Sequence, residues 1–243
     1  MTTPIVHLHT PTLPIQQHIA LDRALMSAVG AGQLPPLVRL WDFPDEAIVV
    51  GIAQNPQDYV HLDACAADGL PVLRRFSGGG TVCLLRGCVV FSVIIPLGGP
   101  LTRYDVHGAY RYILSFAINH LQQLGLPANL QPPCDVAIQN RKIIGCAQAQ
   151  KSNAVLVHGS VLVDAPVNRL ERYLKHPKVA PAYRAGRSHT AFVQNLADYG
   201  FHPSEVAALL ANAWAPERIA ASLIPSFISS AVANAVSLVP RIS

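Results

Sequence analysis

Paired arginines followed by a serine and three glycines form the stretch of this sequence best suited to hold an anion. Residues 74–81 read Arg-Arg-Phe-Ser-Gly-Gly-Gly-Thr. Because glycine adopts positive φ without a Cβ clash, successive N–H groups can converge on one oxyanion, while an arginine supplies charge in a planar fork. Adjacent side chains of an extended segment face opposite ways, so only one of Arg74 and Arg75 can point into such a site. The segment predicts a cradle for a phosphate or carboxylate, with a flexible turn as the alternative.

A lone lysine lies near the tip of a predicted hairpin. Residues 135–138 and 141–145 have the pattern of two strands, and Gln139-Asn140 between them is typical of a tight turn. Lys142 is then a mobile point charge at a strand end, suited to stabilise an oxyanion when an amine attacks an activated acyl group. The residue types alone favour the other interpretation, an ordinary solvated hairpin lysine.

Two further polar residues fall in apolar surroundings. His158 lies within the predicted strand 154–163, which His158-Gly159-Ser160 is expected to break, and it is either a core histidine or a site residue. Asp22 falls on the buried face of a predicted helix. It either meets a polar partner at a packing seam, which the pattern favours, or lies at the rim of a site.

Five cysteines, at positions 65, 83, 88, 134 and 146, form no CxxC pair. Their odd number and the absence of an export signal predict free thiols and make zinc unexpected, and no motif fixes any other metal. Cys134 and Cys146 bracket Lys142, whose charge would favour a thiolate, the nucleophilic form of cysteine. The alternative for both is a small buried apolar side chain.

Apolar periodicity predicts the elements that must position these residues. Helices are expected at 14–31, 104–124, 167–175 and 203–213. Strands are expected at 5–9, 37–41, 47–51, 70–73, 89–95, 135–138, 141–145 and 154–163, with 37–41 and 47–51 joined as a hairpin. Helices mixed with hairpin-spaced strands and few βαβ units predict an α+β fold with a mixed, largely antiparallel sheet packed with helices.

Composition narrows the class of protein. With 243 residues, 51% of them hydrophobic and 13% charged, the chain can bury a sizeable core. The net charge of +4 is spread without a Lys/Arg block, which argues against nucleic acid and for an acidic partner. The N-terminus lacks the pattern of a secretory signal, so a cytoplasmic protein is predicted. Residues 219–240 carry no charge, but Pro225 and several serines predict a helix packed on the domain instead of a membrane span.

The order of these segments resembles the catalytic domain of the lipoate-protein ligase A and octanoyltransferase family, a domain shared with biotin-protein ligases. The segments are the loop 74–81, the hairpin region 135–148 and the strand 156–162, Leu-Val-His-Gly-Ser-Val-Leu. The run 176–189 is similar to a segment of the shorter family members. The resemblance covers about residues 10–200. It implies a class II biotin/lipoate ligase-like catalytic domain at 1–200 and a helical extension at 201–243, with no full accessory domain.

The resemblance also implies roles for individual residues. The glycine loop would wrap the acyl chain and its activated carboxyl, and Lys142 would contact the acyl carbonyl or acyl-phosphate oxygens. Arg75 is then the arginine of the pair that contacts the anion. The other substrate-binding or nucleotide-binding positions implied by the motifs are Ser77, Gly78, Gly79, Gly80, Thr81, Asp135, Gly145, Ala147, His158, Gly159 and Ser160.

Departures from the family pattern bear on the reaction. Cys88 follows Arg86-Gly87 where many family ligases have asparagine, which puts nucleotide contacts there in doubt. The sequence is also too short to include the accessory domain of full-length ligases. A separate subunit would then supply that function, or ATP would not be used. The Pro-Cys-Gly arrangement of one transferase class is absent, since residues 175–178 read Lys-His-Pro-Lys.

We therefore expect an enzyme that attaches a lipoyl or octanoyl group in amide linkage to a lysine of a lipoyl-domain protein, of the 2-oxoacid dehydrogenase E2 or glycine cleavage H type. The favoured mechanism is ligation with ATP and Mg2+ through lipoyl-AMP, with Lys142 stabilising the tetrahedral oxyanion. The alternatives are an octanoyl or lipoyl transferase that uses a cysteine thioester and an acyl-carrier donor, and a non-catalytic acyl-binding partner subunit. Biotin ligation ranks behind these, because the loop lacks a Gly-Arg-Gly-Arg sequence. Neither nucleic acid nor membrane is an expected partner.

Overall fold

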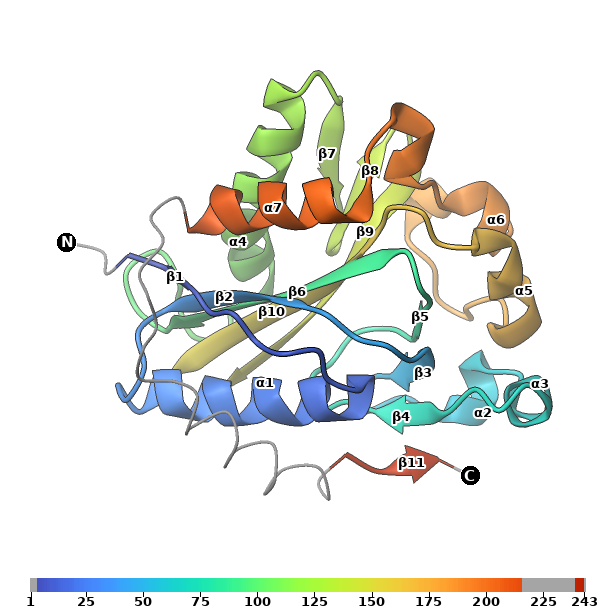
Figure 1. Cartoon of the computed structure of the whole chain (residues 1–243), viewed down its shortest axis with the longest axis horizontal. Helices are drawn as coiled ribbons and strands as arrows, with labels where there is room; N and C mark the ends of the chain where they lie inside the picture. The colour runs from blue at the N-terminus through green and yellow to red at the C-terminus, as the bar shows by residue number, and fades with distance from the viewer. Residues whose placement is uncertain (1–3, 216–238, 243) are drawn as a thin grey trace.

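Two β-sheets form the framework of the protein (Figure 1). The structure is a computed structural model that describes residues 4–215 and 239–242. The larger sheet has seven strands in the order β1-β2-β6-β10-β9-β8-β7. In chain order they are β1 (Val6–His7), β2 (Leu37–Trp41), β6 (Cys88–Pro96), β7 (Ala128–Gln131), β8 (Asp135–Ile138), β9 (Arg141–Lys151) and β10 (Ala154–Leu162). Neighbouring strands in this sheet are antiparallel except β1 and β2.

The smaller sheet has four strands in the order β11-β4-β3-β5. Its strands are β3 (Ala47–Val50), β4 (Val72–Arg74), β5 (Val82–Leu84) and β11 (Arg241–Ile242). Only β3 and β4 run parallel in it. The glycine loop connects β4 to β5, so both of its ends are held in one sheet. The mixed, largely antiparallel sheets packed with helices confirm the predicted α+β fold class.

Long helices cover both faces of the larger sheet (Figure 1). Helix α1 (Ile15–Gly30) lies on one face, and α4 (Val106–Gln123) and α7 (Pro203–Trp214) lie on the other. The shorter segments near the smaller sheet are α2 (Pro56–Tyr59), α3 (Leu62–Ala67), α5 (Leu170–Tyr173), α6 (His189–Phe192) and the 3-10 turns 167–169 and 182–184. The 3-10 turn 196–199 instead packs on the core of the larger sheet. No helix in the described part of the chain is long and apolar enough to cross a membrane.

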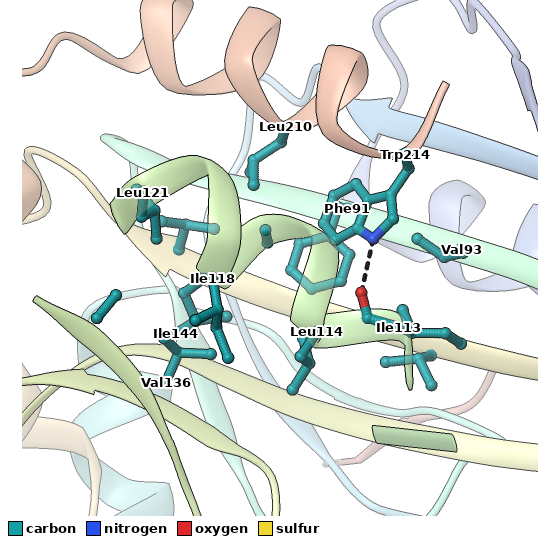
Figure 2. Close-up of a cluster of buried hydrophobic side chains, with 14 of the residues drawn as sticks. Phe91, Val93, Ile113, Leu114, Ile118, Leu121, Val136, Ile144, Leu210 and Trp214 are labelled. Atoms are coloured by element: carbon teal, nitrogen blue, oxygen red, sulfur yellow. Dashed lines mark hydrogen bonds between the residues drawn. The ribbon is translucent and has the colours of Figure 1, made fainter. Parts of the chain in front are cut away.

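The core between α4, α7 and the larger sheet is built from apolar side chains at helical and alternating spacing (Figure 2). Phe91 of β6 lies against Trp214 of α7, with ring centroids 4.7 Å apart. The Trp214 indole Nε1 donates to the backbone oxygen of Ile113 in α4 at 2.8 Å. This bond satisfies the one polar group that the tryptophan carries into the core.

The predicted hairpin of residues 37–41 and 47–51 is wrong. Strand β2 pairs with β1 and β6 in the larger sheet, whereas β3 pairs with β4 and β5 in the smaller one. A connecting residue instead binds the start of α1: the Asp45 side chain accepts a hydrogen bond from the Ile15 backbone N–H at 3.0 Å. A short connection between two apolar runs is therefore compatible with strands that enter different sheets.

Other predicted boundaries need smaller corrections. Strand β10 runs unbroken through His158-Gly159-Ser160, because β6 and β9 pair with it on both sides. The helix predicted at 167–175 is a 3-10 turn followed by the short α5. The three-residue strand β5 was not predicted. Of the segment 219–240 predicted as a packed helix, residues 219–238 lie outside the described residues.

Candidate functional site

A cavity of about 540 Å³ brings most of the predicted site residues together. Its walls come from the glycine loop and β5, from β8, β9 and β10, and from the segment between α5 and α6. Its apolar lining includes Ile19, Trp41, Val49, Leu84, Val90 and Leu162. The predicted residues that border it are Arg75, Gly79, Gly80, Thr81, Cys134, Asp135, Lys142, Gly145, Cys146, Ala147, His158, Gly159 and Ser160. This combination of an apolar slot and a few polar groups suits an acyl chain with a polar head.

Lys142 is held at the cavity by a carboxylate. Its Nζ lies 2.7 Å from Asp135 Oδ1, and the hydroxyl of Tyr183 donates to Asp135 Oδ2 at 2.8 Å. The Lys142 side chain is 28% exposed and that of Asp135 only 8%. Burial by itself would lower the pKa of Lys142, but Asp135 outweighs it and the pKa is raised. Lys142 is therefore a fixed cation and not a base.

The hairpin that carries Lys142 is shaped by its turn and by a glycine. Gln139 and Asn140 have φ of 49° and 61°, as a tight hairpin turn requires. The register shifts between Val136 and Ala137, which places Lys142 opposite Ala137. A Cβ at Gly145 would lie 2.6 Å from Lys142 Nζ, so only glycine leaves room for the ammonium group beside Asp135.

Arg75 holds the glycine loop from behind. Its Nη2 donates to the backbone oxygens of Gly78 and Gly80 at 2.6 and 2.7 Å, and its Nη1 donates to Val49 O at 3.2 Å. The neighbouring Arg74 donates instead to carbonyls of residues 51, 52 and 54. The Nη2 of Arg75 therefore holds carbonyls of the glycine loop, and the direct contact of Arg75 with an anion stays a prediction.

The loop keeps two N–H groups beside the cavity that donate to no other described residue. The Gly78 N–H is used by Gln148 O at 3.1 Å. Within the described part of the chain, those of Gly79 and Gly80 donate no hydrogen bond, and both residues border the cavity. Gly79 has φ of 82°, which favours glycine. The loop thus retains the donors that the sequence predicted for an oxyanion.

Ser77 and His158 meet at the back of the site. His158 Nε2 lies 2.7 Å from Ser77 Oγ, and its Nδ1 lies 3.0 Å from Asp22 Oδ2. His158 borders the cavity, but Ser77 and Gly78 are not among the bordering residues. Asp22 thus has the polar partners expected at a packing seam. Ser77 is a scaffold residue in this geometry, where the sequence motif implied a binding residue.

Neither cysteine beside Lys142 is activated. The Cys134 thiol donates to Cys146 O at 3.2 Å. Burial and the nearby Asp135 raise the pKa of Cys134 against the opposing effect of Lys142. Burial also raises the pKa of Cys146 well above its ordinary value. The expectation that Lys142 favours a thiolate is therefore corrected, because burial and the carboxylate outweigh one cation.

Arg184, another cation at the cavity, was missed from the sequence. Arg184 lies in the 3-10 turn 182–184, is 4% exposed and borders the cavity. Its Nε donates to Arg187 O at 2.9 Å, and its guanidinium carbon lies 4.9 Å from the Phe192 ring centroid. Its Nη2 is buried and has no hydrogen-bond partner. A buried donor without a partner costs free energy, so a polar group bound beside it would be stabilising. The sequence offered no signal beyond the similarity of the run 176–189.

Cys88, the departure from the family's asparagine, is a core residue. It is 8% exposed, packs in the apolar cluster beside the smaller sheet and does not border the cavity. All five cysteines of the chain are free thiols.

Comparison with known proteins agrees with this geometry. The model of the lipoyl protein ligase A/B catalytic domain matches residues 14–215. Octanoyltransferase LipM of Clostridioides difficile is 27% identical over 187 residues, which cover 69% of each chain. A probable lipoate-protein ligase A of Mycoplasma genitalium is 31% identical over 180 residues, which cover 74% of this chain and 52% of that protein. The matched region is thus about half the length of the Mycoplasma relative.

Solved structures share the fold. A lipoate-protein ligase A bound with ATP has a TM-score of 0.79 at 24% identity, covering 98% of this chain and 95% of that one. The bipartite lipoate protein ligase of Thermoplasma acidophilum has a TM-score of 0.78 at 22% identity, with coverage of 98% and 93%. With the family model matching most of its length, the chain belongs to the lipoyl protein ligase A/B catalytic domain family.

Proposed function

We propose that this protein attaches a lipoyl or octanoyl group to a lysine of a lipoyl-domain protein, and that it does so by ATP-dependent ligation. The names of its relatives support acyl attachment but divide between ligase and octanoyltransferase. The observation that carries the choice is the buried, unpartnered Nη2 of Arg184 in the same cavity as Lys142. Lys142 and Arg184, which both border the cavity, suit a donor that carries both a carboxyl and a phosphate.

In the first step, the carboxylate of the acyl substrate attacks the α-phosphorus of ATP and pyrophosphate leaves, which forms a mixed anhydride. Lys142, kept protonated by Asp135, supplies positive charge at the carboxyl end of the cavity. The free N–H groups of Gly79 and Gly80 add fixed dipoles there. Mg2+ would enter with the triphosphate, since the described residues contain no group of three or more potential metal ligands.

In the second step, the acceptor lysine amine attacks the carbonyl carbon, AMP leaves and the amine loses a proton to solvent. The negative charge that develops on the carbonyl oxygen is the group that Lys142 stabilises, and its raised pKa keeps it charged throughout. No cysteine is required for either step, which agrees with the protonated state of the two thiols at the cavity.

The alternative is a transferase that carries the acyl group on a cysteine. The relatives named octanoyltransferase favour it, and the partly exposed Cys134 borders the cavity. To act as a nucleophile, its thiol would have to lose its proton, but its surroundings raise the pKa of that thiol. An acyl carrier that displaced Asp135 would remove the second largest cause of the raised pKa, after burial.

Intact-mass analysis of a lipoyl-domain acceptor tests the proposal. One arm supplies free lipoate or octanoate with Mg-ATP, and the other supplies octanoyl-carrier protein without ATP. We expect a mass gain in the first arm only. Lys142→Met should lower that rate by roughly 100-fold or more, as expected for loss of an oxyanion-stabilising group. Cys134→Ser and Cys146→Ser are the matched variants and should keep the rate within about threefold.

The other outcomes have defined meanings. A gain only from the carrier, abolished by Cys134→Ser or Cys146→Ser, would replace the ligase with the transferase. No gain in either arm would leave a non-catalytic partner, or a ligase that needs a separate accessory subunit. Adding that subunit from a bipartite system distinguishes the last two.

A further inference from the structure

A series of buried polar side chains runs from helix α1 to the glycine loop, and the proposed reaction does not use it. Arg39 Nη2 lies 2.6 Å from Asp22 Oδ1, and Asp22 Oδ2 lies 3.0 Å from His158 Nδ1. His158 Nε2 lies 2.7 Å from Ser77 Oγ, which also lies 2.9 Å from Arg75 Nε. These residues are between 0% and 6% exposed. Helix α1, strand β2, strand β10 and the loop after β4 are thereby joined by direct hydrogen bonds.

The donors and acceptors determine where the protons lie. A guanidinium only donates, so Arg75 Nε–H donates to Ser77 Oγ and leaves the serine hydrogen to donate to His158 Nε2. His158 then carries its own proton on Nδ1 and donates it to Asp22. Arg39 donates to the other oxygen of Asp22 from both Nε and Nη2. With His158 neutral, the Ser77 hydrogen also has an acceptor within the series.

The surroundings of His158 favour that neutral form. Burial lowers the pKa of His158 and outweighs the opposing effect of Asp22, while Arg75 and Arg39 lower it further. At the other end, burial would raise the pKa of Asp22, but Arg39 and His158 lower it, so the group remains a carboxylate. The protonation states required by the hydrogen bonds are those that the local charges favour.

Ser77, His158 and Asp22 have the hydrogen-bond order of a hydrolase triad, but the serine cannot act as a nucleophile here. Ser77 is completely buried and does not border the cavity. Arg75 already occupies a lone pair of its oxygen. The series of hydrogen bonds therefore positions its residues and takes no part in a covalent step.

What it positions is Arg75. The Nε of Arg75 is directed by Ser77, and its Nη2 holds the oxygens of Gly78 and Gly80. We propose that Asp22, His158 and Ser77 are positioning residues that orient Arg75, and through it turn the N–H groups of the glycine loop toward the acyl substrate. The effect on catalysis rests on the proposed function, whereas the effect on the loop does not.

Hydrogen–deuterium exchange of the peptide containing residues 74–81 tests the inference without any activity. Ser77→Ala removes one hydroxyl, and we expect exchange in this peptide to become about tenfold faster, as for loss of one buried hydrogen bond. Ser115→Ala is the matched control, since its hydroxyl donates to Tyr112 O within α4 at 2.8 Å. It should leave the loop peptide unchanged.

Variants further along the series show whether a change is transmitted to the loop through several residues or arises only from the direct contacts of Ser77. Asp22→Asn alters a residue that reaches the loop only through His158, and it should also speed exchange of the loop peptide. Should Asp22→Asn fail to fold, His158→Gln makes the same test, because it removes the bond to Asp22. In enzyme assays the KM of the acyl substrate should rise about tenfold, with the KM of the acceptor domain within about twofold of wild type.

Three results would overturn the inference. Unchanged loop exchange in Ser77→Ala and His158→Gln, with activity lost, would make these residues substrate contacts. Labelling of Ser77 by a fluorophosphonate probe would make it a nucleophile. Equal changes in the KM of both substrates would indicate a general structural role. Faster loop exchange in an enzyme that fails to lipoylate would instead count against the proposed function alone.

Discussion

At the scale of single residues, the position of Lys142 depends on the absence of a side chain at a neighbouring residue, Gly145. Asp135 attracts the ammonium group, but the absence of a side chain at Gly145 is what leaves the space for it. Gly159 is also required, for another reason. A Cβ there would lie 2.8 Å from each of Cys146 Sγ, Gly145 O and Phe91 Cζ, atoms of packed strands and a core ring.

Substitution of the two glycines should affect different properties, activity for Gly145 and stability for Gly159. In Gly145→Ala the new methyl meets the flexible end of Lys142, which can move away from Asp135 at little cost in stability. We expect acyl transfer to fall by roughly 10- to 100-fold while the unfolding free energy changes by less than about 1 kcal/mol. In Gly159→Ala backbone and core atoms must move, so the unfolding free energy should fall by about 1–3 kcal/mol. Urea unfolding and the intact-mass assay measure both, and equal stability losses would contradict the distinction.

At the scale of elements, the β8–β9 hairpin carries both halves of the Lys142–Asp135 pair, so its turn determines how well they meet. Gln139 and Asn140 both have positive φ, a conformation that costs least for Asn-Gly. Ser152 and Asn153, in the turn between β9 and β10, have the same property. The two turns differ in the length of their side-chain hydrogen bonds. Asn153 Oδ1 accepts from Arg103 Nη2 at 2.6 Å, whereas Asn140 Oδ1 accepts from Gln131 Nε2 at 3.4 Å.

Substitution of the first turn should therefore stabilise the protein. We expect the double variant Gln139→Asn, Asn140→Gly to raise the unfolding free energy by about 0.5–1 kcal/mol, because it relieves positive φ at both positions. The matched change Asn153→Gly loses the hydrogen bond to Arg103 and should give no gain. Urea unfolding of both variants provides the comparison. A loss of stability in the double variant would mean that the turn is held by contacts stronger than its own conformation.

At the scale of the whole molecule, buried histidines join helix α1 to both sheets. His18 Nδ1 lies 2.8 Å from Arg39 Nη1, and its Nε2 lies 3.0 Å from Asp42 O. Burial, with Arg39, lowers the pKa of His18 to about 3. His158 is held neutral in the same series. The folded protein therefore resists two protonations that the unfolded chain accepts.

Stability should fall as the pH is lowered below about 6.5, the pKa of an unfolded histidine. The unfolded state then binds protons that the folded state does not. For His18 alone the loss at pH 5 is about 2 kcal/mol, and His158 changes stability in the same direction. Urea unfolding between pH 7.5 and 5 measures the slope. His18→Asn should reduce it, with His158→Gln as the second variant, and a slope unaffected by either would contradict the assignment.

The sequence by itself determined what depends on neighbours along the chain. Apolar spacing located α1, α4 and α7, the turn residues located the β8–β9 hairpin, and the ordered motifs indicated the family and its lysine. Each of these is local, because a helix period or a tight turn is encoded within a few residues.

Only the tertiary structure decided the features that depend on distant partners. It separated β2 from β3, turned Arg75 toward the carbonyls of the glycine loop, and placed Arg184 at the cavity with an unpartnered nitrogen. It also set the surroundings of Cys134 and Cys146, where burial raises the pKa of both thiols. Which strands pair, which side chains are buried and which way a pKa shifts all depend on residues remote in the chain. No local pattern of residues predicts them.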